Sequence, residues 1–523
     1  MELALMIIFA VISTALLGFA IYKSVKIVKN KIRGLIDYPK ELKKLGYITL
    51  ATSISFVALF VFYITFNKFH ILAGEWVELV FGSFLFGATV TSFFVSFIIH
   101  YYGKDLDKKI DKGLFITMIS SLVIFFVALI LLTNSFADYI NYPLPNAISF
   151  TQGFVAPHLK VDGEGFSIAF YALFILGGAI LVYFLCDHRF YQEYGKHGIL
   201  ESTLYVAFPA GIIGARIGYV IGNWNGDGHG VESFAERIAR GEWWSIFAIW
   251  EGGLTILAGA LVGIAVGVLW FKTRKKQYSI WLAMDVIVPT ILIAQAVGRI
   301  GNFLNCEVYG QEVLAANCWI FPKIITNNMM FGTHGEMNVT PGYIHLPLFL
   351  IEALCNVIGY FVIRYGVGKG LRKYIEPGDQ AASYLIWYGI VRVLLEPLRD
   401  ANFNMGTKGY WSWFWSFFFI VGGALLIAAN HLIRYFVYRG TDKMIPLNND
   451  FRNGLIVTAG FTVPAIVLIA VGASMMATGT YVETLSYNQY SCGMFTLILG
   501  VSVLLMNGTS IPHVLMGMPA REK

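Results

Sequence analysis

Charged side chains are scarce in this chain of 523 residues: aspartate, glutamate, lysine and arginine make up 13%, whereas hydrophobic residues make up 57%. A soluble core of this size would not have such a composition. The apolar runs are long enough to cross the ~30 Å hydrocarbon core of a bilayer many times. The composition therefore excludes a soluble globular enzyme and predicts an integral membrane protein.

Cysteine is also rare, with five residues in the whole chain. None of them stands at the spacing of metal ligands, so most are expected to fill small gaps between helices. Cys306 and Cys318 both lie in one expected outer segment and could pair, and the sequence does not decide whether they do.

Long apolar runs supply thirteen candidate membrane spans. Their length favours helices over a β-barrel. The first run is followed, not preceded, by a basic segment, so it is interpreted as a retained anchor and not as a cleaved signal. The predicted fold class is an all-α, polytopic membrane helix bundle of about thirteen transmembrane helices. The spans lie near residues 3–22, 46–66, 76–99, 115–134, 166–187, 203–222, 247–271, 281–303, 343–364, 379–399, 411–433, 453–477 and 492–510.

The distribution of basic residues predicts an orientation. If thirteen spans alternate, 28 of the 38 lysines and arginines fall in segments on one side of the membrane. Because loops rich in lysine and arginine stay in the cytoplasm, the amino terminus is expected outside and the carboxyl terminus inside. The net charge of +6 is then explained by inner loops facing anionic lipid, without a nucleic-acid partner.

Four arginines lie within or at the ends of predicted helices that run outward: Arg216, Arg299, Arg392 and Arg399. An arginine in hydrocarbon costs at least ~2.5–3.5 kcal/mol on insertion scales, so each is expected to face a protein interior or a wet cavity. All four lie in the outward halves of their helices and can converge on one outer pocket. The alternative is that they pair with carboxylates and lock helices together, and for Arg399 the two interpretations have equal weight.

One helix carries a polar stripe. Tyr388, Arg392, Glu396 and Arg399 recur every three or four residues, which places them on one face. A planar guanidinium suits a phosphate through its bidentate pair of donors, and phospholipid head groups are the abundant anions at that depth. The arginines therefore predict a phospholipid head-group site, although a transporter for an organic anion would show similar residues.

The segment from Gly298 to Gly310 reads Gly-Arg-Ile-Gly-Asn-Phe-Leu-Asn-Cys-Glu-Val-Tyr-Gly. It resembles the signature of the prolipoprotein diacylglyceryl transferases, G-R-x-G-N-F-x-N-x-E-x-x-G, at every specified position. Further segments similar to the family follow its order along the chain: 170–172, 214–219, 250–254, 345–352 and 384–392. The resemblance covers a seven-helix core at 151–440 with an outer cap near 304–342, between a four-helix extension at 1–150 and a two-helix extension at 441–523.

The resemblance implies an enzyme of the bacterial plasma membrane that transfers the diacylglyceryl group of phosphatidylglycerol to the lipobox cysteine of a prolipoprotein. A thioether forms, glycerol phosphate leaves, and no metal or cofactor is implied. The implied roles follow the matching positions. Arg299 and Arg392 would clamp the phosphate, Asn302 and Glu307 would orient the head group, and Tyr171 and Tyr388 would donate hydrogen bonds to it. Gly310, Arg216, Glu396 and Arg399 complete the expected substrate-binding set.

Two departures from the family pattern leave the general base open. The family usually has a histidine shortly after its Gly-Gly pair, whereas this chain continues from Gly252 and Gly253 to Gly259 without one. The segment from His345 to Glu352 is one residue longer than usual and lacks the family tyrosine. Glu307, His345 or a water held by them could serve as the base, and His345 fits a structural role better.

Two alternatives belong to other functional classes. A transporter or flippase could use the arginines for an anionic solute, although the chain shows no internal repeat beyond a shared Arg-Ile-Gly. A non-catalytic phospholipid-binding relative gains weight from the missing histidine. The oligomeric state, the lipoprotein substrates and the role of the terminal extensions do not follow from the sequence.

Overall fold

The computed structural model describes residues 2–523 except 32–37, 68–72, 103–107, 150–152, 156–166, 227–232, 249–254, 334, 373–374, 404–409, 439–443, 446–450, 481–486, 517 and 520–523. Within these residues twelve helices are long and apolar enough to cross a membrane, which confirms the predicted all-α polytopic bundle. These twelve contain α1 (Glu2–Lys31), α2 (Tyr38–Asn67), α3 (Ala73–Tyr102), α4 (Lys108–Phe136), α5 (Phe170–Tyr194), α6 (Glu201–Gly222), α9 (Ile280–Leu304), α11 (Leu348–Phe361), α12 (Asp379–Leu395), α13 (Tyr410–Tyr438), α14 (Phe451–Thr478) and α15 (Gln489–Met516). A further long helix, α8 (Ile256–Arg274), lies at the remaining one of the thirteen predicted spans.

Short elements connect the long helices. The strands are β1 (Ala147–Ser149), β2 (Gly153–Val155), β3 (Ser167–Ala169), β4 (Glu312–Leu314), β5 (Tyr343–His345), β6 (Met444–Ile445) and β7 (Met518–Pro519). The antiparallel pairs are β1 with β2, β4 with β5, and β6 with β7. The short helices are α7 (Phe234–Ala239), α10 (Lys323–Asn328) and the 3₁₀ turns η1 (Ala137–Tyr139), η2 (Trp243–Phe247), η4 (Ala315–Cys318), η6 (Glu396–Leu398) and η7 (Ala401–Phe403).

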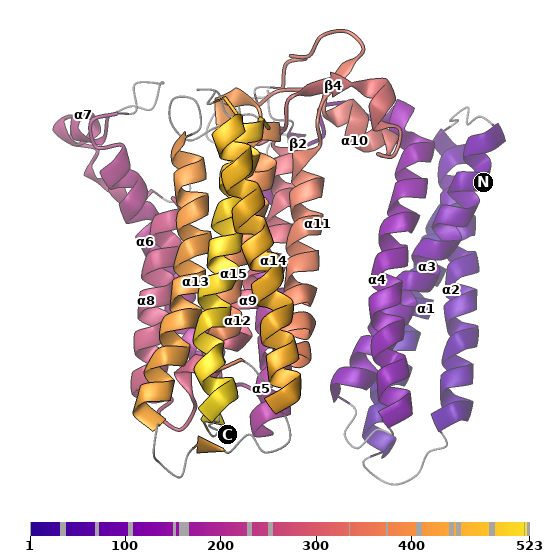
Figure 1. The fold of residues 1–523 in the computed structure, drawn as a ribbon. Coiled ribbons are helices and arrows are strands. Elements are labelled where there is room, and N and C mark those ends of the chain that lie inside the picture. Colours follow the sequence, from indigo (N-terminus) through magenta and orange to yellow (C-terminus); the bar gives the residue numbers. More distant parts are fainter. Residues whose placement is uncertain are drawn as a thin grey trace. The chain divides into compact units, whose positions relative to one another are not determined.

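The chain forms two compact units (Figure 1). The first holds residues 1–167 and 312–347, and the second holds residues 168–311 and 348–523. Most of the predicted cap thus groups with the four amino-terminal helices. The predicted division into an extension at 1–150, a core at 151–440 and a second extension at 441–523 stays a prediction. The boundaries of the two compact units fall at other residues.

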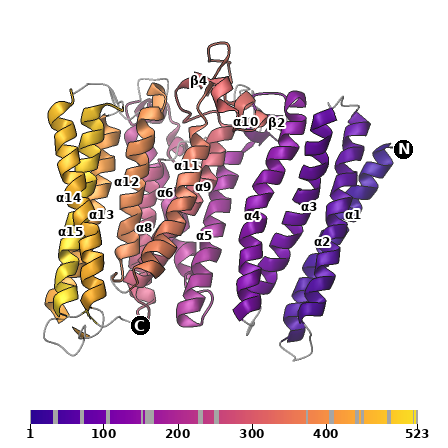
Figure 2. The ribbon, with the colours of Figure 1, turned by 45° about the vertical axis from the view of Figure 1, so that its right-hand side comes forward.

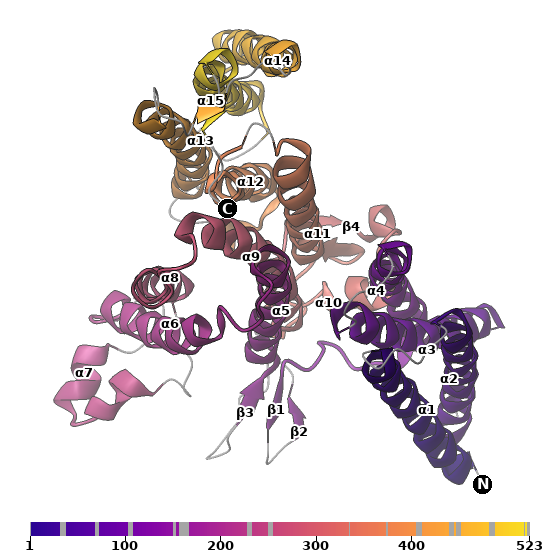
Figure 3. The same cartoon turned by 90° about the horizontal axis from the view of Figure 1, so that it is seen from below.

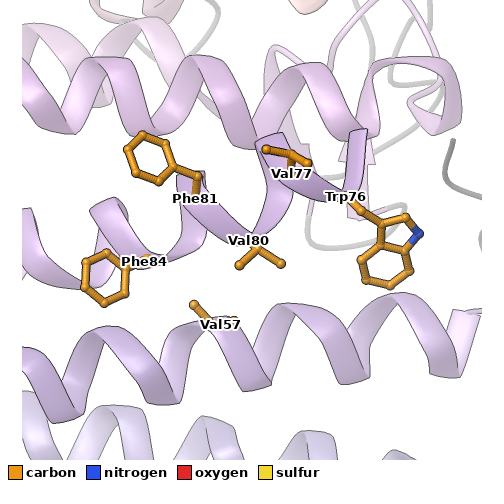
Figure 4. A pocket seen from close by; sticks show the side chains of 6 residues that line it. All are labelled: Val57, Trp76, Val77, Val80, Phe81 and Phe84. Atoms are coloured by element: carbon orange, nitrogen blue, oxygen red, sulfur yellow. The ribbon is translucent and has the colours of Figure 1, made fainter. Parts of the chain in front are cut away.

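The first unit is built from α1 to α4 and the segment 312–347 (Figure 2). Small residues let its helices approach closely, since a side chain at Gly87 would meet the backbone of Ser53. The cap segment is fastened to α4, where the Lys323 backbone N–H donates to the Asn134 side chain at 2.8 Å. Figure 4 shows a groove between α2 and α3 lined by Val57, Trp76, Val77, Val80, Phe81 and Phe84. This purely apolar surface suits lipid tails.

In the second unit α12 takes a central place, in contact with α9, α11 and α13 (Figure 3). Glycines again permit the closest approaches: a side chain at Gly389 would collide with the Ser416 carbonyl on α13, and one at Gly178 would meet the backbone of Ala294 on α9. Successive long helices of this unit run in opposite directions (Figure 1). The prediction that the basic loops lie on one side of the membrane requires this alternation. Which end of the bundle faces the cytoplasm remains a prediction.

Three predicted spans start too early. The span at 166–187 corresponds to α5, which begins at Phe170 after strand β3. The span at 247–271 corresponds to α8, which begins at Ile256 after the 3₁₀ turn η2. The span at 343–364 corresponds to α11, which begins at Leu348 because residues 343–345 form strand β5. In all three places a short element precedes the helix and its apolar residues extend the hydrophobic run, so hydropathy alone does not separate the two. Beyond α11 the chain continues as a π-helix, η5 (Val362–Gly370).

Candidate active site

The end of α9 is shaped by a tight loop that turns Glu307 back toward the helix. Cys306 and Val308 adopt positive φ angles of 49° and 57°, a conformation that residues other than glycine rarely take. The Glu307 backbone N–H donates to the Asn302 carbonyl at 3.0 Å. Its carboxylate Oε1 accepts hydrogen bonds from the side-chain amides of Asn302 at 2.7 Å and Asn305 at 3.3 Å. Backbone strain of this kind is concentrated at functional sites.

Gly301 lets Tyr171 reach this loop. A Cβ at Gly301 would overlap the Tyr171 ring, so only glycine allows the start of α5 to lie against the end of α9. The structure thereby brings Tyr171 to the motif, as predicted from its position in the family order.

Arg299 is held by a buried carboxylate. Its Nη2 lies 2.5 Å from Oε1 of Glu352 on α11, and its Nη1 donates to Asn302 Oδ1 at 3.3 Å. The Glu352 side chain is 3% exposed, whereas that of Arg299 is 20% exposed. The other oxygen of Glu352 lies 3.5 Å from Nη2 of Arg399. Glu352 therefore joins two of the four predicted arginines.

Arg392 on α12 lies 3.1 Å from Glu396, and Glu396 also lies 3.6 Å from Arg399. The Glu396 side chain is completely buried, yet neither carboxylate oxygen accepts a hydrogen bond of acceptable geometry from the described part of the chain. Three arginines and two glutamates thus form one cluster with one excess positive charge. A buried polar group that lacks a directed partner is costly, and an excess of positive charge in a low-dielectric site attracts an anion.

A seam of aromatic and amide groups continues from the cluster along α9 and α12. Gln295 on α9 donates from Nε2 to the Tyr384 hydroxyl at 3.0 Å. The Tyr384 ring stacks on Tyr388 with 6.1 Å between centroids, and Tyr388 meets the edge of Phe419. This packing fixes the orientation of the Tyr388 ring. Tyr388 lies on α12 one turn before Arg392.

The backbone after the motif is clamped to the end of α12. Gly310 and Arg399 form an antiparallel bridge, the Gln311 N–H donates to the Leu398 carbonyl at 2.9 Å, and the Asp400 N–H donates to the Tyr309 carbonyl at 3.2 Å. Gly310 accordingly takes part through its backbone, and the bridge holds Arg399 beside the motif.

Two predicted residues have other partners. Arg216 donates to the carbonyls of Ser245 at 2.6 Å and Ile246 at 3.0 Å, and its guanidinium lies 5.6 Å from each of two aromatic rings. These contacts hold η2 against α6. His345 belongs to the first compact unit, where its Nε2 lies 2.8 Å from Asn338 Oδ1 and its backbone N–H donates to Met329. The contacts described for Arg216 are thus to η2 and to two aromatic rings, and those described for His345 lie within the first compact unit.

Glu352 was missing from the predicted site residues. The available signal was a carboxylate within an otherwise apolar helix, at the end of a segment similar to the family. The segment 250–254, also part of the resemblance, lies outside the described residues. Cys306 and Cys318 are thiols and do not form a disulfide. Among the described residues no group of three or more histidine, cysteine or acidic side chains is arranged to hold a metal ion.

Comparison with known proteins assigns the chain to a family. The family model described as prolipoprotein diacylglyceryl transferase matches residues 159–429. Three relatives carry the name phosphatidylglycerol–prolipoprotein diacylglyceryl transferase. That of Halalkalibacterium halodurans is 36% identical over 50% of this chain and 82% of its own, that of Streptococcus suis is 33% identical over 46% and 80%, and that of Lactococcus lactis is 32% identical over 53% and 92%. With the signature segment and the arginine cluster inside the matched region, the chain belongs to the prolipoprotein diacylglyceryl transferase family.

Proposed function

We propose that this chain transfers the diacylglyceryl group of phosphatidylglycerol to the cysteine thiol of a prolipoprotein in the bacterial plasma membrane, with the cluster of Arg299, Arg392, Arg399, Glu352 and Glu396 as the phosphate site. The observation that supports this assignment is the excess positive charge of that cluster beside the strained loop that carries Glu307. The proposed partners are phosphatidylglycerol, the lipobox segment of the prolipoprotein and the bilayer.

The chemistry is a displacement at carbon. The thiolate of the substrate cysteine attacks the carbon of the diacylglyceryl group that is bonded to the phosphate oxygen. A C–S bond forms there, and the bond between that carbon and the phosphate oxygen breaks. Glycerol phosphate leaves with the electron pair, while the thiol proton must pass to a base. The enzyme therefore has two tasks: to accept that proton, because the thiolate is the nucleophile, and to stabilise charge on the departing phosphate.

Arg299 and Arg392 are suited to the second task. Each guanidinium has five N–H donors, so one salt bridge leaves further donors for a phosphate. Their side chains remain 20% and 14% exposed, whereas that of Arg399 is 7% exposed. Arg399 therefore serves to position the two glutamates, and Glu352 and Glu396 serve to aim the arginines.

Glu307 is the base that the geometry favours. Both hydrogen bonds described for its carboxylate fall on Oε1, so Oε2 is the oxygen proposed to receive the proton. An ionised carboxylate is the form of this side chain that accepts a proton. His345 is engaged with Asn338 in strand β5 and suits a structural role.

A transfer assay tests the proposed function. The purified full chain would be mixed with phosphatidylglycerol labelled in its acyl chains and a lipobox peptide. We expect label on the peptide and release of glycerol phosphate, and no label on a control peptide with serine in place of the cysteine. Saturable lipid binding with no transfer to the cysteine peptide would overturn the proposal in favour of a non-catalytic lipid-binding protein.

The proposed substrate also requires the site to face the outer side of the membrane. A cysteine introduced at Asn225, after α6, should react with an impermeant thiol reagent added outside intact cells. A cysteine at Lys275, after α8, should react only once the cells are opened. The reverse pattern would place the arginine cluster at the cytoplasmic side and remove a secreted prolipoprotein as substrate.

A further inference from the structure

The seam of Gln295, Tyr384 and Tyr388 leads from the arginine cluster into the second unit. Gln295 lies on α9, four residues before Arg299. Tyr384 lies on α12, eight residues before Arg392. Because an α-helix rises about 1.5 Å per residue, Gln295 is about 6 Å from Arg299 along the axis of α9. The hydrogen bond between Gln295 and Tyr384 therefore joins the two helices further inside the unit than the ends that carry the arginines.

Hydrogen bonding within the pair of Gln295 and Tyr384 is incomplete. Nε2 of Gln295 donates to the Tyr384 hydroxyl at 3.0 Å, whereas Oε1 of Gln295 is buried and accepts no hydrogen bond from the described residues. The hydroxyl proton of Tyr384 likewise has no acceptor in the described part of the chain. If the amide turns by half a rotation, the hydroxyl donates to Oε1 and both protons of Nε2 become available instead. In either arrangement the pair keeps a donor for a further acceptor.

This pair differs from a contact that only fastens helices, which is expected to satisfy its own atoms because an unpaired buried polar group is costly. Asp285 makes such a contact between the same two helices. Its oxygens accept from the N–H groups of Gly378 at 2.8 Å and Ala381 at 3.0 Å, at the start of α12. The side chains of Gln295 and Tyr384 are partly exposed, so a bound molecule can reach them. The pair therefore suits a ligand that offers an acceptor.

A phospholipid brings ester carbonyls to this level. The carbonyls are attached to the glycerol backbone, between the phosphate and the acyl chains, and an ester accepts hydrogen bonds without donating any. With the phosphate at Arg299 and Arg392 and the chains directed along the apolar parts of α9 and α12, the glycerol backbone lies next to the pair. The rings of Tyr384 and Tyr388, which stack with 6.1 Å between centroids, supply an apolar wall for the first methylene groups of the chains.

We propose that the Tyr384 hydroxyl donates a hydrogen bond to an ester carbonyl of phosphatidylglycerol and that Gln295 holds this hydroxyl in place. The inference rests on the proposed function for the position of the phosphate. Tyr384 is then a substrate-binding residue that recognises the ester linkage, and Gln295 is a positioning residue. Together with the arginines, this contact holds the lipid at two points and fixes the carbon between them, which the thiolate attacks.

Phosphatidylglycerol with two ether-linked chains tests the proposal, because it lacks both carbonyls and keeps the head group and the chains. The affinity of the full chain in detergent would be measured for the diester and the diether lipid by displacement of a fluorescent phosphatidylglycerol. One hydrogen bond of average strength changes an affinity about two- to tenfold, so the parent should bind the diester lipid more tightly by about that factor. The rate of transfer to a lipobox peptide would be measured with both lipids in parallel.

Tyr384→Phe removes the hydroxyl and keeps the ring that stacks on Tyr388. This variant should bind the diester lipid only as tightly as the diether lipid, with its affinity for the diether lipid unchanged, which isolates one contact. Gln295→Met keeps the length of the side chain and cannot donate to the hydroxyl, so it should also lower the ratio of the two affinities. The matched control is Tyr360→Phe on α11, beside Phe361, which should keep the ratio of the parent.

Equal affinities of the parent for the two lipids would overturn the proposal. So would a Tyr384→Phe variant that keeps the ratio of the parent, or one that weakens the binding of both lipids equally, as a purely structural role predicts. An unchanged ratio in Gln295→Met would overturn the positioning role of Gln295. Binding with the expected ratio but without transfer would overturn the proposed function and leave the ester contact in place, whereas no saturable binding of either lipid would overturn both.

Discussion

The two ends of the second unit each bury a group of charged residues, and the two groups are built differently. At the end where α12 begins, carboxylates are satisfied by directed hydrogen bonds. Asp285 accepts from the N–H groups of Gly378 at 2.8 Å and Ala381 at 3.0 Å, and Asp379 accepts from Glu376 N–H, Asn430 and His431. At the end where α12 finishes, Glu396 is held within the described part of the chain by two arginines, neither of which donates a hydrogen bond of acceptable geometry to it.

This difference separates a structural group from a reactive one. Backbone donors cannot move away from Asp285 and Asp379 without unwinding a turn, so that group fastens α9, α12 and α13 to one another. The arginine cluster is built from long side chains, has one excess positive charge and includes buried atoms that lack a hydrogen bond in the described structure. Such a buried charged group contributes little to the stability of a fold. Such an arrangement is expected where an anionic substrate completes the pairing.

The largest expected effect concerns the proton acceptor. Glu307→Gln should reduce transfer by about 10²–10⁴-fold, the contribution of a positioned acid or base, because the amide keeps the shape of the side chain and cannot accept the proton. Phosphatidylglycerol binding should persist. His345→Gln should change the rate much less, since His345 is engaged within the cap segment. Single-turnover transfer measured against pH for the parent and both variants decides the matter; identical profiles and rates would exclude both residues as the base.

A matched substitution compares the two groups directly. Arg392→Lys should lower the rate of transfer by about 10²–10³-fold, the cost of losing one placed donor to a developing anion, because lysine keeps the charge but not the planar fork. Arg434→Lys, near Glu376 at the other end, should leave the rate close to that of the parent. Similar losses in both variants would mean that the two groups do not differ in role.

The smallest expected effect on catalysis comes from the structural group. Asp379→Asn removes a negative charge that accepts hydrogen bonds from three donors. A hydrogen bond to a charged group contributes about 1.5–3 kcal/mol to the free energy of unfolding, so the variant should be less stable. We expect a lower thermal unfolding midpoint in detergent together with nearly normal transfer at low temperature. A normal unfolding midpoint with slow transfer would instead place Asp379 in the catalytic machinery.

Much of the site could be predicted from the sequence because the signals are local. The cost of an arginine in hydrocarbon is a property of each residue, so Arg299, Arg392 and Arg399 stood out before any packing was known. The motif from Gly298 to Gly310 is continuous, and the loop after α9 folds within itself around Glu307.

Other features depend on which way each helix faces, and the sequence does not carry that information. Arg216 satisfied the same criteria as the other three arginines, yet α6 turns it toward the carbonyls of η2. Glu352 became part of the site because α11 packs against α9.

The sequence by itself determined the membrane-embedded helical fold, the exceptional arginines and the continuous motif, because hydrophobicity, insertion cost and local chain order are carried by single residues or short segments. Only the tertiary structure decided the pairing of Arg299 and Arg399 through Glu352 and the contacts of His345 within the first compact unit. These features arise from the rotation and packing of helices that are distant in the chain, and an apolar surface packs in several ways that hydropathy does not distinguish.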